Sequence, residues 1–187
     1  MGERFTDNKW IGNKYRDGSE KTKRMVLTGL FFAIALVLSI VEGMLPGVPI
    51  PVPGVKFGLS NIAVMYALFF MGTSQAYTIA VLKALFVGVT RGIVAGVLSL
   101  FGGVLSITVM LLLLLIFKDR ISYLVLSIFG AVAHNCGQFA VISIIYAGVG
   151  MWAYLPILLI SGVIAGIVTA TLLKFILPAF KSWFNNK

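Results

Sequence analysis

A short polar run lies inside a long apolar stretch of the sequence. Residues 130–138 read GAVAHNCGQ, so that His134 and Gln138 are four residues apart and Asn135 lies beside them. In a helix this spacing puts His134 and Gln138 on one face. Such polar groups are costly inside a membrane and are candidates for function there. Two main interpretations stay open: hydrogen bonds between helices, or a polar wall of a substrate cavity. A metal site is a lesser alternative, because the sequence offers His134 no second ligand.

Three cations form a second set of candidates. Lys83 and Arg91 lie in the apolar stretch 76–91, and Lys56 precedes another apolar stretch, while Glu42 is the one acid placed to neutralise them. Long basic side chains near the end of a span can extend to the interface, which accounts for Arg91 but poorly for Lys83. We therefore expect a cavity that prefers an anionic or carboxylate-bearing ligand.

Other kinds of chemistry have no residues to carry them. The sequence contains no GxxxxGK[ST] nucleotide-binding loop, and its three aspartates, Asp7, Asp17 and Asp119, are scattered. No cluster of His, Cys and carboxylate residues has the spacing of a metal site. We predict no catalytic residues, no metal, no cofactor and no freestanding enzyme activity.

The composition indicates which elements position these residues. The chain has 187 residues, a mean hydropathy of +1.02, 59% hydrophobic residues and 11% charged residues. Soluble domains carry about 25% charged residues. This composition excludes a disordered chain, a collagen-like rod, a disulfide scaffold and an ordinary soluble enzyme. The net charge of +9 is concentrated at the chain ends and in short loops, so we predict a membrane protein with no nucleic-acid partner.

The apolar stretches predict an all-α integral membrane protein with six transmembrane helices. A spanning helix needs about 20 apolar residues. The second segment is short, and a five-helix alternative would fuse residues 59–91, but the polar sequence 72–75 is typical of a turn. The expected segments are 25–44, 59–71, 76–91, 98–117, 121–146 and 153–177.

The positive charges predict the orientation. With six spans and a cytoplasmic N-terminus, twelve of the 15 Lys and Arg residues fall on the inner side. Both termini are then cytoplasmic. The expected organisation is a polar tail over 1–24, a membrane domain over 25–177 and a C-terminal tail over 178–187.

Two further features concern the first span and the loop after it. Pro46, Pro49, Pro51 and Pro53 favour an extended apolar segment, which is either a rigid connector or a lid over a cavity. Within the first span, Gly29 and Ala33 form a pair of small residues that permits close helix approach. Similar pairs at Gly88/Gly92 and Gly92/Gly96 suggest tight internal packing.

Two sequence patterns carry a family resemblance. Residues 54–61, GVKFGLSN, and residues 130–138, GAVAHNCGQ, resemble the Gx transporter family, also named heptaprenyl diphosphate synthase component I, over about residues 22–175. That family is similar to the substrate-binding S components of energy-coupling factor transporters. The resemblance implies a multi-pass, S-component-like bundle in a bacterial cell membrane. From these patterns and from the position of Lys83 within an apolar stretch, the candidate substrate-binding residues are Lys56, Asn61, Lys83, His134, Asn135 and Gln138.

The resemblance also implies partners. S components borrow two ATPases and a transmembrane coupling subunit, which Gly29 and Ala33 would contact, and the proline segment would be the lid. The synthase name implies an alternative: a non-catalytic membrane component of heptaprenyl diphosphate or menaquinone synthesis, with a soluble prenyl diphosphate synthase as partner, or of a membrane redox complex. The sequence lacks the paired aspartates of prenyl chain elongation. A purely structural membrane protein is the third interpretation.

Overall fold

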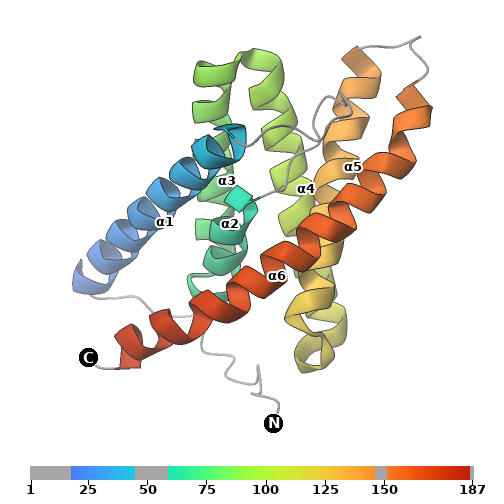
Figure 1. Cartoon of the computed structure of the whole chain (residues 1–187). Coiled ribbons are helices and arrows are strands. Elements are labelled where there is room, and N and C mark those ends of the chain that lie inside the picture. The colour runs from blue at the N-terminus through green and yellow to red at the C-terminus, as the bar shows by residue number, and fades with distance from the viewer. Residues whose placement is uncertain (1–17, 45–58, 146–150, 186–187) are drawn as a thin grey trace.

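The computed structural model describes residues 18–44, 59–145 and 151–185 of the chain, and every regular element in these ranges is helical (Figure 1). Two short 3₁₀ helices, η2 (Lys118–Arg120) and η3 (Met151–Tyr154), precede α5 and α6. The α-helices are α1 (Gly18–Met44), α2 (Leu59–Phe70), α3 (Thr73–Arg91), α4 (Ile93–Phe117), α5 (Tyr123–Ile145) and α6 (Leu155–Asn185).

Two connections between helices explain where the predicted segments are right and wrong. The predicted break between helices is confirmed at Gly72, because α2 ends at Phe70 and Gly72 adopts a φ of 104° before α3, but residues 73–75 of the predicted turn belong to α3. The five-helix alternative is therefore wrong. The predicted gap between 91 and 98 is also wrong, since Gly92 alone, with a φ of 96°, joins α3 to α4. At the chain ends, α1 and α6 extend beyond the predicted spans.

Four of the described helices are long and apolar enough to cross a membrane, and the spans are Lys21–Met44, Ile93–Phe117, Tyr123–Ile145 and Leu155–Phe175. α2 has 12 residues, which make about 18 Å of helix against a hydrocarbon core of about 30 Å. α3 is long enough, but it carries Lys83 and Arg91 and is not among these four. The protein is an integral membrane helical protein.

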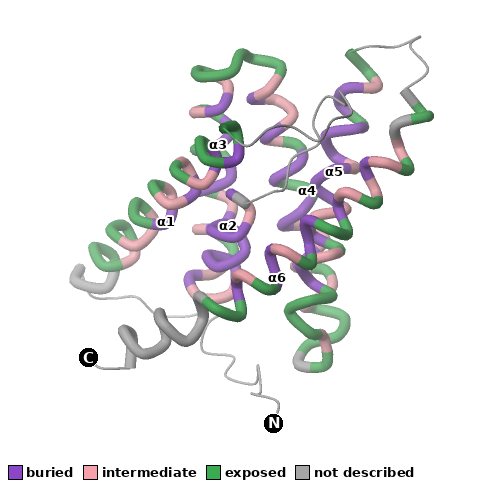
Figure 2. The backbone as a smooth tube through the Cα atoms, in the orientation of Figure 1, coloured by how far each residue is buried: buried purple, intermediate pink, exposed green. Residues whose placement is uncertain are grey.

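The helices form two groups that share an interface. α4 packs against α5, α5 packs against α6, and α1 packs against α2 and α3, while α3 and α4 connect the groups. α2 is the central element, and residues 62–68 are all buried within it (Figure 2). The ring of Tyr66 stacks on both Phe31 of α1 and Phe70, with centroids 4.5 Å apart in each pair. The aromatic core therefore lies around this short helix.

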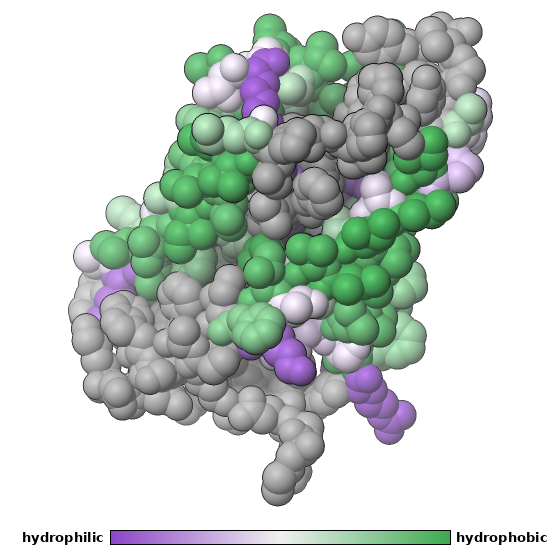
Figure 3. Space-filling view, viewed as in Figure 1, coloured by the Kyte–Doolittle hydropathy of each residue, from purple (hydrophilic) through white to green (hydrophobic). Residues whose placement is uncertain are grey.

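The outer surface is apolar. The space-filling view shows hydrophobic residues over most of the described surface, with hydrophilic residues gathered mainly at the two ends (Figure 3). Large side chains such as Leu115, Ile116 and Phe175 are exposed along the helices. Contiguous exposed apolar surface on this scale marks a lipid or protein contact, in agreement with an integral membrane protein.

Glycines allow the helices to approach closely. A Cβ atom on Gly96 would lie 2.7 Å from the Cα of Gly88, and one on Gly166 would lie 2.5 Å from the Cα of Ile128. The predicted tight packing is thus confirmed for Gly88 and Gly96. It is wrong for Gly92, which forms the junction between the helices and has nothing within 4 Å of its Cβ position.

Candidate functional site

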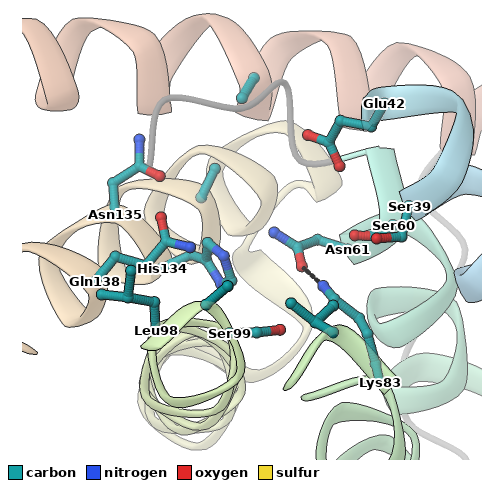
Figure 4. A pocket seen from close by; sticks show the side chains of 14 residues that line it. Ser39, Glu42, Ser60, Asn61, Lys83, Leu98, Ser99, His134, Asn135 and Gln138 are labelled. Atoms are coloured by element: carbon teal, nitrogen blue, oxygen red, sulfur yellow. Dashed lines mark hydrogen bonds between the residues drawn. The ribbon is translucent and has the colours of Figure 1, made fainter. Parts of the chain in front are cut away.

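A cavity of about 150 Å³ lies between the two groups of helices (Figure 4). All six α-helices contribute side chains to its wall, and most of these side chains are small or polar. The lining residues are Ser39, Glu42, Ser60, Asn61, Lys83, Val87, Ala95, Leu98, Ser99, Ala131, His134, Asn135, Gln138 and Ala165.

The charged side of the cavity comes from α1, α2 and α3. Lys83 is 6% exposed, and its Nζ donates a hydrogen bond to Oδ1 of Asn61 at 2.9 Å. Glu42, near the end of α1, is 8% exposed and lines the same cavity. Two buried ionisable side chains of opposite sign therefore face one small space, which is costly unless each charge is compensated.

The opposite side of the cavity comes from α4 and α5. His134, Gln138 and Ser99 are all buried there. Within the described part of the chain, the Ser99 hydroxyl and Oε1 of Gln138 have no hydrogen-bond partner. An unsatisfied buried polar atom costs about 1–3 kcal/mol. These two atoms are therefore places where a bound molecule can form hydrogen bonds that the described residues do not supply.

The position of His134 depends on a glycine of α4. A Cβ atom on Gly102 would lie 2.9 Å from both Nδ1 and Cε1 of the His134 ring and 2.9 Å from the His134 carbonyl oxygen. Glycine at this point lets α5 approach α4 until the imidazole lies directly against the α4 backbone. A side chain at residue 102 would therefore displace the imidazole, which lines the cavity.

Asn135 differs from its neighbours. Its Nδ2 donates to the carbonyl oxygen of Leu158 at 2.8 Å and to Oγ of Ser161 at 3.2 Å. Both acceptors belong to α6, and in Figure 4 the Asn135 amide points toward that helix while His134 and Gln138 lie nearer the cavity. Asn135 therefore makes the interhelical hydrogen bonds that the sequence left as one of two interpretations.

The predicted binding residues are partly brought together. Five of the six line the same cavity: Asn61, Lys83, His134, Asn135 and Gln138. Lys56 lies outside the described residues, as do Pro46, Pro49, Pro51 and Pro53 of the predicted lid. Their role in binding stays a prediction.

Arg91 does not line the cavity. Its Nη2 donates to the carbonyl oxygen of Ser39, and its guanidinium lies where a Cβ atom on Gly43 would be. The side chain thus fastens the end of α3 to the end of α1. Arg91 is exposed at the end of α3, and besides the interfacial role that we expect it has a defined partner within the bundle.

Sequence reasoning missed three serines of the cavity, Ser39, Ser60 and Ser99. Glu42 was identified from the sequence as a counter-charge and not as part of a site. The spacing of Ser39 and Glu42 could have identified both as cavity residues. They are three positions apart on α1, and residues with that spacing share a helix face.

A second hollow of about 500 Å³ lies between the N-terminal halves of α1 and α3. Gly29 is on its wall, and both Gly29 and Ala33 are exposed on α1, with nothing within 4 Å of the Gly29 Cβ position. The small-residue pair of α1 thus has no close helix against it among the described residues. Lys21, Arg24, Thr28, Ser74, Gln75 and Thr78 provide the polar part of this hollow.

Among the residues that the structure describes, no three His, Cys, Asp or Glu side chains gather as a metal site. The cavity instead offers an amine, a carboxylate, an imidazole, amides and hydroxyls in a small enclosed volume. These groups can bind a small polar molecule by charge and hydrogen bonds.

The fold and the cavity define the class: a helical integral membrane protein with a small polar cavity between its helices. The family model for heptaprenyl diphosphate synthase component I matches residues 31–176. The chain belongs to the heptaprenyl diphosphate synthase component I family. No curated protein and no solved structure matches the chain significantly.

Proposed function

We propose that this protein is the substrate-binding membrane subunit of an energy-coupling factor type transporter that takes up a small, carboxylate-bearing organic molecule. The observation that carries the proposal is the buried Lys83 on the wall of a polar cavity within an apolar bundle. Ionisable residues inside membrane segments are expensive and commonly mark substrate pathways. Lys83 supplies the positive charge that a carboxylate needs.

The size of the cavity favours a small ligand. Pockets for drug-sized molecules measure about 300–1,000 Å³, whereas a cavity of about 150 Å³ can hold benzene. The cavity here, about 150 Å³, belongs with the second kind. A long prenyl diphosphate is many times larger, so the cavity supports binding of a small nutrient more than binding of a polyprenyl chain.

The proposal includes six membrane-crossing segments, cytoplasmic termini and a coupling subunit with two ATPases. The exposed Gly29 and Ala33 support it, because small residues on an exposed helix surface permit close approach of another transmembrane helix. In this arrangement the protein binds and releases substrate without catalysing a reaction, and its partners hydrolyse ATP.

The second candidate is a non-catalytic membrane component of heptaprenyl diphosphate or menaquinone synthesis, or of a membrane redox complex. The family description supports this candidate. Its partner would be a soluble prenyl diphosphate synthase subunit, and the cavity would then be a structural feature or a site for a regulatory molecule.

Native mass spectrometry of the gently purified full chain tests the proposal. We expect a retained small molecule, which is lost in Lys83→Met and kept in the matched control Lys174→Met, because Lys174 is exposed on α6. Co-purification of ATPase and coupling subunits is the second expected result. Recovery of a prenyl diphosphate synthase, with no small molecule bound to the wild type, would support the second candidate instead.

A further inference from the structure

The two amide side chains that α5 places on the cavity wall differ in what they contact. Asn135 donates hydrogen bonds to the carbonyl oxygen of Leu158 and to Oγ of Ser161, both on α6, at 2.8 and 3.2 Å. Gln138 lies three positions further along α5 and is 9% exposed, and its Oε1 has no hydrogen-bond partner among the described residues. Helix α6 thus engages Asn135, whereas the carbonyl oxygen of Gln138 can accept a hydrogen bond from a bound molecule.

The Ser99 hydroxyl on α4 is a second polar group of this kind. A hydroxyl in a helix commonly bonds to the carbonyl oxygen four residues earlier, and Thr78 and Thr108 do so at 2.9 and 2.8 Å. Ser99 is 7% exposed and has no such partner within the described part of the chain. Ser143 of α5 also has a buried hydroxyl without a described partner, but it does not line the cavity. Ser143 therefore provides a matched position outside the cavity.

The two groups lie at different points of the cavity wall. In Figure 4, Ser99 lies between Gln138 and Lys83, and its hydroxyl points toward the side of Lys83. Gln138 lies on the far side of this view from Lys83. A ligand that extends from α3 across the cavity therefore passes Ser99 before it reaches the amide of Gln138.

The chemistry of the wall determines which ligand group fits Gln138. An amide oxygen only accepts hydrogen bonds, so the complementary ligand group carries an O–H or N–H. Among the lining residues, α4, α5 and α6 contribute no carboxylate, and the one titratable side chain that they contribute is His134. A neutral imidazole does not compensate an ammonium group and a protonated one repels it. An uncharged donor is therefore favoured at this end of the cavity.

From this arrangement we propose that Gln138 determines the specificity of the cavity by accepting a hydrogen bond from a ligand hydroxyl or amide N–H, with Ser99 as a second contact. Together with the proposed function, on which it rests, this assignment narrows the substrate class to small carboxylates with a hydroxyl or amide group distant from the carboxylate. The cavity volume of about 150 Å³ limits such a ligand to a chain of a few carbon atoms.

The first test compares matched pairs of molecules on the wild-type full chain in nanodiscs of neutral lipid. One series contains ω-hydroxy acids with two to five carbon atoms, each paired with the acid in which a methyl group replaces the hydroxyl. A further pair is succinamate and 4-oxopentanoate, which differ by an amide nitrogen against a methyl group. Binding is measured by isothermal titration calorimetry. We expect the best donor-bearing ligand to bind about 10- to 100-fold more tightly than its partner, because the partner leaves a buried acceptor unsatisfied.

The second test changes the acceptor. In Gln138→Met, which removes the carbonyl oxygen at similar side-chain length, we expect the two members of the best pair to bind equally. Gln138→Glu keeps an acceptor oxygen at the same position along the side chain and should retain the preference. If Gln138→Met weakens both members and leaves their ratio unchanged, Gln138 has a structural role and the inference is overturned.

A third comparison tests Ser99. We expect Ser99→Ala to weaken binding of the best ligand about 3- to 10-fold, which corresponds to the loss of one hydrogen bond. Ser143→Ala is the control, because it removes a buried hydroxyl that does not line the cavity. Equal affinities in Ser99→Ala and Ser143→Ala would show that Ser99 does not contact the ligand.

The outcomes separate the specificity of Gln138 from the proposed function. If both members of every pair bind to the wild type with equal affinity, Gln138 accepts hydrogen bonds from cavity water only. The inference is then overturned, and the proposed uptake of a carboxylate stands. If no member of any pair binds and native mass spectrometry detects no small molecule, both are wrong. The wild-type comparison decides between these outcomes even if a variant does not fold.

Discussion

Small residues have opposite surroundings in α1 and in the α4–α5–α6 group. On α5, a Cβ atom at Gly137 would lie 2.9 Å from the carbonyl oxygen of Phe101, so that α4 occupies all the space that the glycine leaves. On α1, Gly29 has nothing within 4 Å of its Cβ position, and Ala33 is exposed. A pair of small residues thus indicates that close approach is available, and the fold decides whether the approaching helix belongs to the same chain.

The largest effect is expected where α6 meets α5. Leucine at position 166 would place side-chain atoms into the backbone of Ile128, which cannot move aside as a side chain can. We expect Gly166→Leu to destabilise the protein by about 3 kcal/mol or more, as overpacking does in a dense core. Thermal unfolding in mild detergent measures this loss. An unfolding temperature equal to that of the wild type would show that α5 and α6 are not in close contact.

A smaller effect is expected at the glycine against His134. Gly102→Ala requires the imidazole and the α5 backbone to shift by several tenths of an ångström, because all three nearest atoms belong to His134. We expect a stability loss of about 1–3 kcal/mol and weaker ligand binding. Gly103→Ala is the matched control, since its new Cβ atom would meet Ala80 at an ordinary 3.4 Å. Equal losses in both variants would contradict a specific role for residue 102.

Asn135 tests the contact between α5 and α6 through hydrogen bonds. Asn135→Leu removes two donors to α6 and leaves the Leu158 carbonyl oxygen with Ser161 as its hydrogen-bond donor. We expect a loss of about 1–2 kcal/mol, with little change in ligand selectivity, because the Asn135 amide is already engaged by α6. Unfolding and ligand titration measure the two quantities separately. A changed order of ligand affinities would show that Asn135 contacts the ligand.

The smallest effect on stability is expected on α1. Replacing both Gly29 and Ala33 with leucine adds side chains to a surface with open space and should change stability by about 0.5 kcal/mol or less. The same double variant should lose the proposed coupling subunit during co-purification. If complex formation survives unchanged, the assignment of this face as a docking surface is wrong.

Much of the helical pattern could be predicted, because apolar runs and polar interruptions are local features of a sequence. The turn at Gly72 followed from its polar neighbours, and Lys83, His134 and Gln138 were conspicuous in apolar surroundings. The junction at Gly92 could not be found in this way, because Ile93 and the residues after it continue the apolar run. A single glycine between two helices changes the local composition too little to be recognised as a connection.

The candidate site was predicted less completely, for a related reason. Ser39, Ser60 and Ser99 are small and can hydrogen-bond to their own helix, so that serine in a membrane helix is not a strong functional signal. The separate role of Asn135 depends on where α6 lies, and the sequence of α5 does not contain that information. Charged and strongly polar residues in an apolar helix can be recognised one at a time, because burying them costs free energy. Serines become informative only once their neighbours are known.

The single-residue connection at Gly92 has a consequence for biogenesis. A Lys or Arg at the centre of an inserting segment costs about 2.5–3.5 kcal/mol, while each Leu, Ile, Val or Phe contributes a favourable 0.3–0.6 kcal/mol at about that depth. α3 carries Lys83 and Arg91, whereas α4 has no charged residue and is the most apolar of the candidate spans. With one residue between them, we expect the two helices to enter the bilayer together as a hairpin. The apolar α4 would then offset the cost of inserting Lys83.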